Sequence, residues 1–129
     1  MSTVLVTTCT AAKAEGDGLS ARERYKGPRV AFAAAESQRR GLPLFFLSGR
    51  FGLVAATDPV PWYDQALQGE DVASLVPWLL EQLGAFGWDA VVFLARAADT
   101  PGWAPYHQAM GRACAEAGVP VRLELTDLD

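Results

Sequence analysis

Four short apolar segments recur along the chain, and they predict the strands of one sheet. The first three, residues 3–8, 43–47 and 90–94, lack a clean polar alternation, which is typical of strands covered on both faces. The fourth, residues 119–125, alternates apolar and polar positions. This alternation predicts a half-exposed strand at an edge of the sheet.

Segments with helical periodicity separate the predicted strands. Residues 29–40 are rich in alanine, a strong helix former. Over residues 72–83, a stripe of apolar residues three and four positions apart predicts a second helix. Pro77 fits the first turn of this helix if Ser74 is its N-cap, so the helix is expected to begin after Ser74. A third stripe predicts a helix over residues 106–117.

The alternation of strands and helices predicts a single α/β domain over residues 1–129. We expect a small three-layer, Rossmann-like fold with a mostly parallel four-stranded sheet. The length of 129 residues fits one domain, and a hydrophobic content of 50% provides a core for it.

The net charge and the cysteine content indicate which kinds of partner and cofactor the chain can bind. A formal net charge of −4 disfavours general coating of DNA or RNA, which needs many Lys and Arg side chains, but it allows a small anionic ligand held by a few local cations. Cys9 and Cys114 are far apart and form no CxxC pair, so they indicate neither a zinc site nor a disulfide framework. We also expect no metal and no cofactor. No apolar run is long enough to span a bilayer and no signal peptide is evident, which favours a cytoplasmic protein with no membrane partner.

The connection after the second predicted strand holds the clearest candidate site. Ligands of open parallel sheets bind beyond the carboxyl ends of the strands, where Ser48, Gly49, Arg50 and Gly52 follow the apolar run. The glycines permit positive φ, successive N–H groups in such a turn can cradle an anion, and Arg50 adds a forked donor. The same residues also fit a plain turn with a solvated arginine.

Three further side chains are candidates for the same site. Lys13 follows the first predicted strand and would add a second cation. Tyr63 would stack on a base, while Asp64 would accept a hydrogen bond from a sugar hydroxyl or act as an acid or base. The alternatives are a solvated lysine and an aromatic lid over the end of the sheet.

Four motifs occur in order over residues 4–67. They are "TTCTAAKA", "ARERYKGPRV", "FLSGRFGLV" and "WYDQAL". Together they resemble a family of small bacterial and phage proteins of unknown function, itself distantly similar to the YaaA-type peroxide-stress proteins. The resemblance implies that six side chains in these motifs cluster for function, namely Lys13, Tyr25, Ser48, Arg50, Tyr63 and Asp64. It also implies a ligand that contains a nucleobase.

The leading hypothesis is a protein that binds a nucleotide-like or nucleobase-like ligand and acts on a glycosidic or phosphate linkage. Its catalytic residues would be Asp64 and Lys13, and its ligand-binding residues would be Ser48, Gly49, Arg50, Gly52, Tyr25 and Tyr63. The first alternative is a non-catalytic interaction module or homo-oligomer that uses some of its four tryptophans. The second is a weak DNA-binding protein with a basic cluster at Arg22, Arg24, Lys26 and Arg29.

Overall fold

The structure is a computed structural model that describes residues 2–129. Its strands are β1 (Thr3–Thr8), β2 (Leu44–Ser48), β3 (Gly52–Ala55), β4 (Ala90–Ala95) and β5 (Val121–Leu125). Its helices are α1 (Ala21–Arg24), α2 (Pro28–Arg40), α3 (Val72–Phe86) and α4 (Ala104–Ala117), and a short 3₁₀ turn, η1 (Gly69–Asp71), precedes α3. The predicted α/β class is confirmed.

The sheet has five strands in the order β3-β2-β1-β4-β5. Strands β2, β1, β4 and β5 are parallel, and β3 runs antiparallel to β2. The prediction of four strands was therefore wrong, because the chain reverses directly after Ser48 and places Leu53 opposite Leu47. An antiparallel hairpin needs only a tight turn, so β3 fits into a segment that the sequence suggested was a ligand-binding loop.

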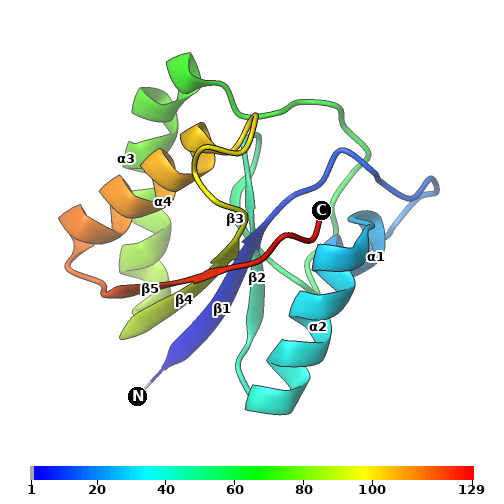
Figure 1. The fold of residues 1–129 in the computed structure, drawn as a ribbon, viewed down its shortest axis with the longest axis horizontal. Helices are drawn as coiled ribbons and strands as arrows, with labels where there is room; N and C mark the ends of the chain where they lie inside the picture. Colours follow the sequence, from blue (N-terminus) through cyan, green and yellow to red (C-terminus); the bar gives the residue numbers. More distant parts are fainter. Residues whose placement is uncertain (1) are drawn as a thin grey trace.

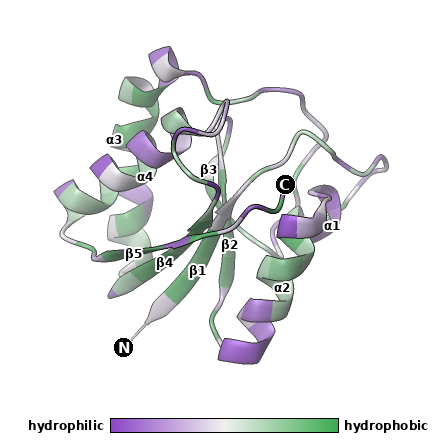
Figure 2. Ribbon diagram, in the orientation of Figure 1, coloured by the Kyte–Doolittle hydropathy of each residue, from purple (hydrophilic) through white to green (hydrophobic). Residues whose placement is uncertain are grey.

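The helices lie on both sides of the sheet and form three layers. Helices α1 and α2 lie on one side, and α3 and α4 lie on the other (Figure 1). The strands are mainly hydrophobic, while the hydrophilic segments are at the outer surfaces and at the end of α2 (Figure 2). Phe46, Leu79 and Met110 have no exposed surface, so the core extends from the sheet into the α3 and α4 layer.

Helix α3 begins earlier than the sequence pattern suggests. It starts at Val72, directly after η1, so Ser74 is inside the helix and is not its N-cap. Pro77 consequently lies beyond the first turn, where the carbonyl of Ala73 lacks its usual N–H donor. Both residues are exposed, which lets water take the place of that donor. No helix within residues 2–129 has the length and apolarity needed to cross a membrane.

The two edges of the sheet differ. At the β3 edge, the backbone N–H and C=O of Leu53 bond to the side-chain amide of Gln82 at 2.8 and 2.9 Å. The N–H and C=O of Ala55 bond to the carboxylate and N–H of Asp58 at 3.0 and 2.9 Å. At the other edge, every residue of β5 is exposed except Glu124, which is partly exposed. The predicted edge position is therefore confirmed. The prediction that the strand is only half exposed is wrong, because the apolar residues Val121, Leu123 and Leu125 are exposed and Glu124 is the least exposed residue of the strand.

The strand order defines where ligands are expected. The chain passes from β1 to β2 on one side and returns to β4 on the other side of β1. Such a reversal opens a crevice at the carboxyl ends of the two central strands. In this chain the crevice is expected between β1 and β4, one strand away from the Ser48–Gly52 turn.

Candidate functional site

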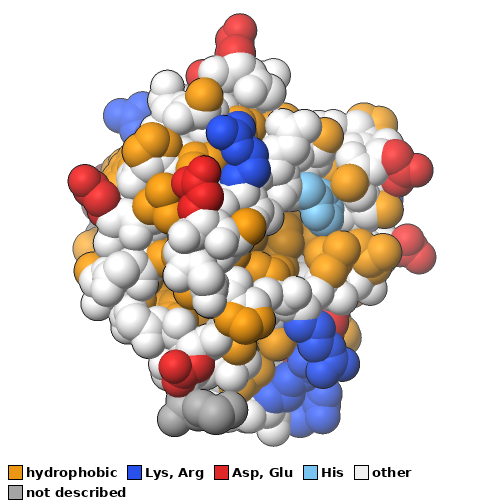
Figure 3. Space-filling model, turned by 90° about the vertical axis from the view of Figure 1, so that its left-hand side faces the viewer, with side chains coloured by type: hydrophobic (Ala, Val, Ile, Leu, Met, Phe, Trp, Pro, Cys, Tyr) orange, Lys and Arg blue, Asp and Glu red, His pale blue; other side chains and the backbone are white. Residues whose placement is uncertain are grey.

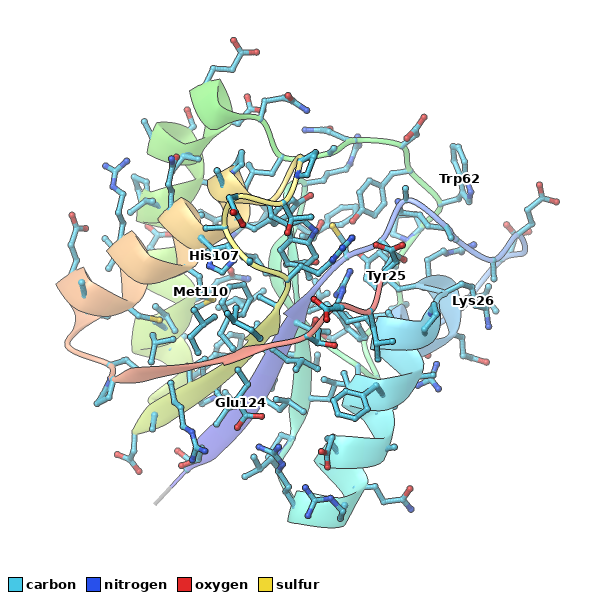
Figure 4. The ribbon with its side chains drawn as sticks, viewed as in Figure 1. Tyr25, Lys26, Trp62, His107, Met110 and Glu124 are labelled. Atoms are coloured by element: carbon cyan, nitrogen blue, oxygen red, sulfur yellow. The ribbon has the colours of Figure 1, made fainter. Side chains whose placement is uncertain are left out.

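A cavity of about 450 Å³ opens at the carboxyl end of β1. Its walls are the segment after β1, the start of α2 and the start of α4, and its lining residues are Thr8–Ala12, Lys26–Arg29, Trp103, Tyr106 and Asp129. In Figure 4, Lys26 lies beside the start of α2, and Tyr25 next to it lies close to the end of β1. The cavity therefore coincides with the position that the strand order predicts.

Arg29 is the only arginine that lines this cavity, and it is almost completely buried, with 3% of its surface exposed. Its Nη1 donates to Thr7 Oγ1 at 2.6 Å and to the Thr8 carbonyl at 3.0 Å. Its Nε is buried and has no acceptor among residues 2–129. Burial lowers the pKa of the guanidinium to about 10, so it is still charged at neutral pH. A buried cation with an unused donor favours an anionic partner.

Asp129 is the acidic residue of the cavity. Its backbone carbonyl accepts from the Arg29 N–H at 2.8 Å, at the N-terminus of α2. Its carboxylate lies 2.5 Å from Nη1 of Arg96, which follows β4 and also has a buried Nε without an acceptor among the described residues. The Asp129 side chain is 85% exposed, so an anionic ligand that binds more strongly can compete with it for the Arg96 guanidinium.

The aromatic wall of the cavity comes from α4. The Trp103 ring centroid lies 4.8 Å from the Arg29 guanidinium, a cation–π distance. The Tyr106 hydroxyl accepts from the Leu67 N–H at 3.1 Å and lies 3.5 Å from the Cys9 sulfur. These contacts fix the ring of Tyr106 and leave Trp103, which is partly exposed, as the aromatic surface available to a ligand.

Lys13 and Asp64 lie together in a second, smaller hollow of about 60 Å³. It shares Cys9, Thr10, Ala11 and Tyr106 with the larger cavity. Lys13 Nζ donates to the Thr10 carbonyl at 2.5 Å and lies 4.6 Å from the centre of the Tyr63 ring. The two predicted catalytic side chains are therefore neighbours of the cavity, and their catalytic role stays a prediction.

The Ser48–Gly52 turn uses its own donors internally. The Ser48 hydroxyl accepts from the N–H groups of Arg50 and Phe51, both at 3.1 Å. Gly49 packs against Leu67, and Gly52, with φ of +68°, joins the turn to β3. Arg50 is exposed, with its guanidinium 5.5 Å from the Phe51 ring. This geometry is that of a hairpin turn, and ligand binding by Ser48, Gly49, Arg50 and Gly52 stays a prediction.

Tyr25 and Tyr63 form a buried chain of hydroxyls with Ser48. The two phenol oxygens are 2.6 Å apart, and Tyr63 Oη is 2.8 Å from Ser48 Oγ. Burial raises the pKa of Tyr25 to about 12 and also raises the pKa of Tyr63. Ser48, Tyr25 and Tyr63 are thus brought together, but Tyr25 has no exposed surface and Tyr63 has only 5% exposed, so ligand binding by the two tyrosines stays a prediction.

Sequence reasoning missed the residues that line the larger cavity on the α2 and α4 sides. Arg29 stood out only as part of a basic cluster, and Trp103 only as one of four tryptophans. The useful signal was the glycine and proline before Arg29, because a helix that starts there points its N-terminus towards the end of β1. Within residues 2–129, no three His, Cys, Asp or Glu side chains gather to hold a metal ion.

Comparison of the chain with models of protein families, with curated proteins and with solved structures gives no match. The resemblance of the four motifs to a family of unknown function therefore stays a prediction.

Proposed function

We propose that the protein binds a small anionic ligand of the nucleotide class in the cavity between β1, α2 and α4. The observation that carries the proposal is Arg29, a buried guanidinium at the cavity with a donor that no described residue uses. The volume of about 450 Å³ is within the range of small-molecule sites. The position at the β1 and β4 crevice supports the same conclusion.

The lining residues suggest where each part of such a ligand would bind. A phosphate would lie at the start of α2, where Arg29, the exposed Lys26 and the positive end of the helix dipole favour an anion. A base or other flat ring would pack on Trp103. The phosphate would take the place of Asp129 at the Arg29 N–H, since both are acceptors for the same donor.

A hydrolytic step would use the smaller hollow next to this cavity. Asp64 would take a proton from the attacking water, and Lys13 would donate to the oxygen of the leaving group, so that a glycosidic or phosphate linkage is broken. The support is that both side chains line a hollow that shares Cys9, Thr10, Ala11 and Tyr106 with the proposed binding cavity.

Calorimetric titration with nucleoside monophosphates, nucleosides, free bases and inorganic phosphate tests the proposal. We expect monophosphates to bind more tightly than nucleosides, because only the former carry the charge that Arg29 requires. Arg29→Gln and Lys26→Gln should each weaken binding by about tenfold or more, since a hydrogen bond to a charged group contributes about 1.5–3 kcal/mol. Arg39→Gln, at the opposite end of α2, is the matched control and should leave the affinity unchanged.

Two results would contradict the proposal. The first is the absence of binding by any of these compounds to the wild-type protein. The second is equal binding by the wild type and Lys26→Gln, a variant of an exposed residue that does not threaten the fold. Turnover is tested separately, by following release of base or phosphate with Asp64→Asn and Lys13→Gln, which should bind normally and show no release.

A further inference from the structure

The backbone of β5 has one row of peptide groups that faces away from the sheet. The Pro120 carbonyl accepts from the Val91 N–H and the Thr126 N–H donates to the Ala95 carbonyl, both at 2.9 Å. In a parallel pair, alternate residues direct both peptide groups to the neighbour, so the even-numbered residues face β4. The peptide groups of Val121, Leu123 and Leu125 therefore face outwards at the edge.

This edge is open, in contrast to the β3 edge. At β3, Gln82 and Asp58 occupy the outward peptide groups of Leu53 and Ala55. At β5, no hydrogen bond within residues 2–129 engages the outward groups of Val121, Leu123 or Leu125. An unpaired strand edge is a template for another strand, and natural proteins commonly protect it. This chain protects one edge and leaves the other available.

The side chains of β5 are complementary to themselves in the reverse direction. The sequence of the strand is Val121-Arg122-Leu123-Glu124-Leu125. If two copies pair antiparallel about Leu123, Arg122 of each copy lies opposite Glu124 of the other, and Val121 lies opposite Leu125. The three outward-facing residues then form hydrogen-bonded pairs, and the two charged pairs occupy non-hydrogen-bonded sites, where opposing side chains are closest.

We propose that the protein forms a two-fold symmetric dimer in which β5 pairs antiparallel with β5 of a second copy, centred on Leu123. The proposal uses the interaction surface of β5 and is independent of the ligand site. Identical partners related by a two-fold axis are the commonest form of protein oligomer.

The exposure of the two faces of β5 fits this partner. Val121, Leu123 and Leu125 are 38%, 48% and 61% exposed, and together they form a row of apolar side chains on one face of the strand. Figure 3 shows hydrophobic side chains exposed between the histidine and a group of Lys and Arg side chains. On the other face, Arg40 holds the Glu124 carboxylate with two hydrogen bonds of 2.8 Å. Glu124 is thus fixed in place as an acceptor for Arg122 of the second copy, as its position on β5 in Figure 4 illustrates.

Within one chain, Arg122 is available for this contact. Its guanidinium Nε is 3.7 Å from the Glu124 carboxylate, and its side chain is 78% exposed. An ion pair of that length and exposure holds the arginine weakly. Arg122 can therefore turn to Glu124 of a second copy at little cost.

Sedimentation velocity of the wild-type chain and of two charge variants tests the dimer. We expect the wild type to dimerise with increasing concentration. Arg122→Glu and Glu124→Arg each place like charges opposite one another at both charged pairs, so each should weaken dimerisation by about tenfold or more. Arg50→Glu makes the same charge change at the turn before β3, far from β5 in the strand order, and should dimerise like the wild type.

Mixing the two variants distinguishes the proposed register from a general loss of folding. A chain with Glu at 122 and 124 is complementary to one with Arg at both positions, so the two variants should form a heterodimer with about the affinity of the wild-type dimer. Circular dichroism confirms that each variant is folded. The proposal is overturned if the wild type stays monomeric up to its solubility limit, if both variants dimerise normally, or if the folded variants do not recover the dimer on mixing.

Discussion

The phenol oxygens of Tyr25 and Tyr63 lie 2.6 Å apart in the interior, and the Ser48 hydroxyl completes a chain with them. Ser48 already accepts from two backbone N–H groups, so its own hydrogen must be donated to Tyr63. One small side chain therefore ties the β2–β3 turn to both tyrosines. This arrangement yields the first two predictions.

Ser48→Ala should lower the free energy of unfolding by about 2–3 kcal/mol, because it leaves two N–H groups and a buried phenol without their partner. Urea denaturation measures the change. Ser74→Ala is the control, since Ser74 is exposed and makes no side-chain hydrogen bond with a described residue, and it should change stability by less than about 0.5 kcal/mol. Equal effects of the two substitutions would contradict the proposed hydrogen-bonding role of Ser48.

Tyrosine ionisation should be suppressed in the folded protein. Burial raises the pKa of Tyr25 to about 12 and raises the pKa values of Tyr63 and Tyr106, which are all the tyrosines of the chain. A raised pKa in the folded state means that the unfolded chain loses its protons first. The stabilisation is therefore complete below the unfolded pKa near 10 and is lost as the pH rises through the folded pKa values.

An absorbance titration of tyrosinate measures this effect. The folded protein should show no ionisation step near pH 10, whereas the chain in concentrated denaturant should show all of it there. Between pH 10 and 12, stability should fall by about 1.4 kcal/mol per pH unit for each tyrosine, and Tyr25→Phe should reduce this slope by one such contribution. A third of the signal appearing near pH 10 in the folded protein would contradict the burial of one tyrosine.

Arg24→Met should be strongly destabilising. The Arg24 guanidinium is buried and donates to the carbonyls of Val60, Ala14 and Gly16 at 2.9, 2.6 and 2.8 Å. Loss of these charged hydrogen bonds should cost about 3 kcal/mol or more, which thermal or urea unfolding would detect. Arg112→Met on the exposed side of α4 is the matched control, and a similar loss there would indicate a general effect of charge removal.

Two glycine substitutions should change the free energy of unfolding in opposite directions. Gly111 is inside α4 with open space around it, so Gly111→Ala should stabilise the protein by about 0.5–1 kcal/mol. Gly52 has φ of +68°, and an added Cβ would meet the Gln82 side chain, so Gly52→Ala should destabilise it by about 1–2 kcal/mol or more. A destabilising Gly111→Ala or a neutral Gly52→Ala would contradict these local geometries.

The fold was largely predictable because the strongest signals were local. The apolar runs of β1, β2 and β4 and the periodic stripes of α3 and α4 depend on neighbouring residues alone. Strand β3 was missed because its four residues follow a tight turn, and four residues are too few for periodicity to be recognised. The start of α3 was missed because η1 leads directly into it.

The position of the candidate site was predicted only in part, because it depends on strand order. The general rule placed ligands at the carboxyl ends of the strands, but the sequence did not show that β1 and β4 are neighbours. The chain was therefore expected to concentrate its site after β2, near Ser48. The sequence placed Arg29 only in the basic cluster of the DNA-binding alternative, because charged side chains are usually exposed. Its burial depends on packing against Thr7 and Trp103, which are distant in the sequence.

The side chains of Gln82 and Asp58 at β3 affect how many copies of the chain could join one continuous sheet. If β5 joins two copies, the two outer limits of the combined sheet are both β3 strands, whose outward peptide groups at Leu53 and Ala55 are already bonded within their own chain. No third copy can then add to the sheet by backbone pairing at these positions. Assembly through β5 would thereby be limited to a finite pair and would avoid the open-ended stacking that leads to fibres.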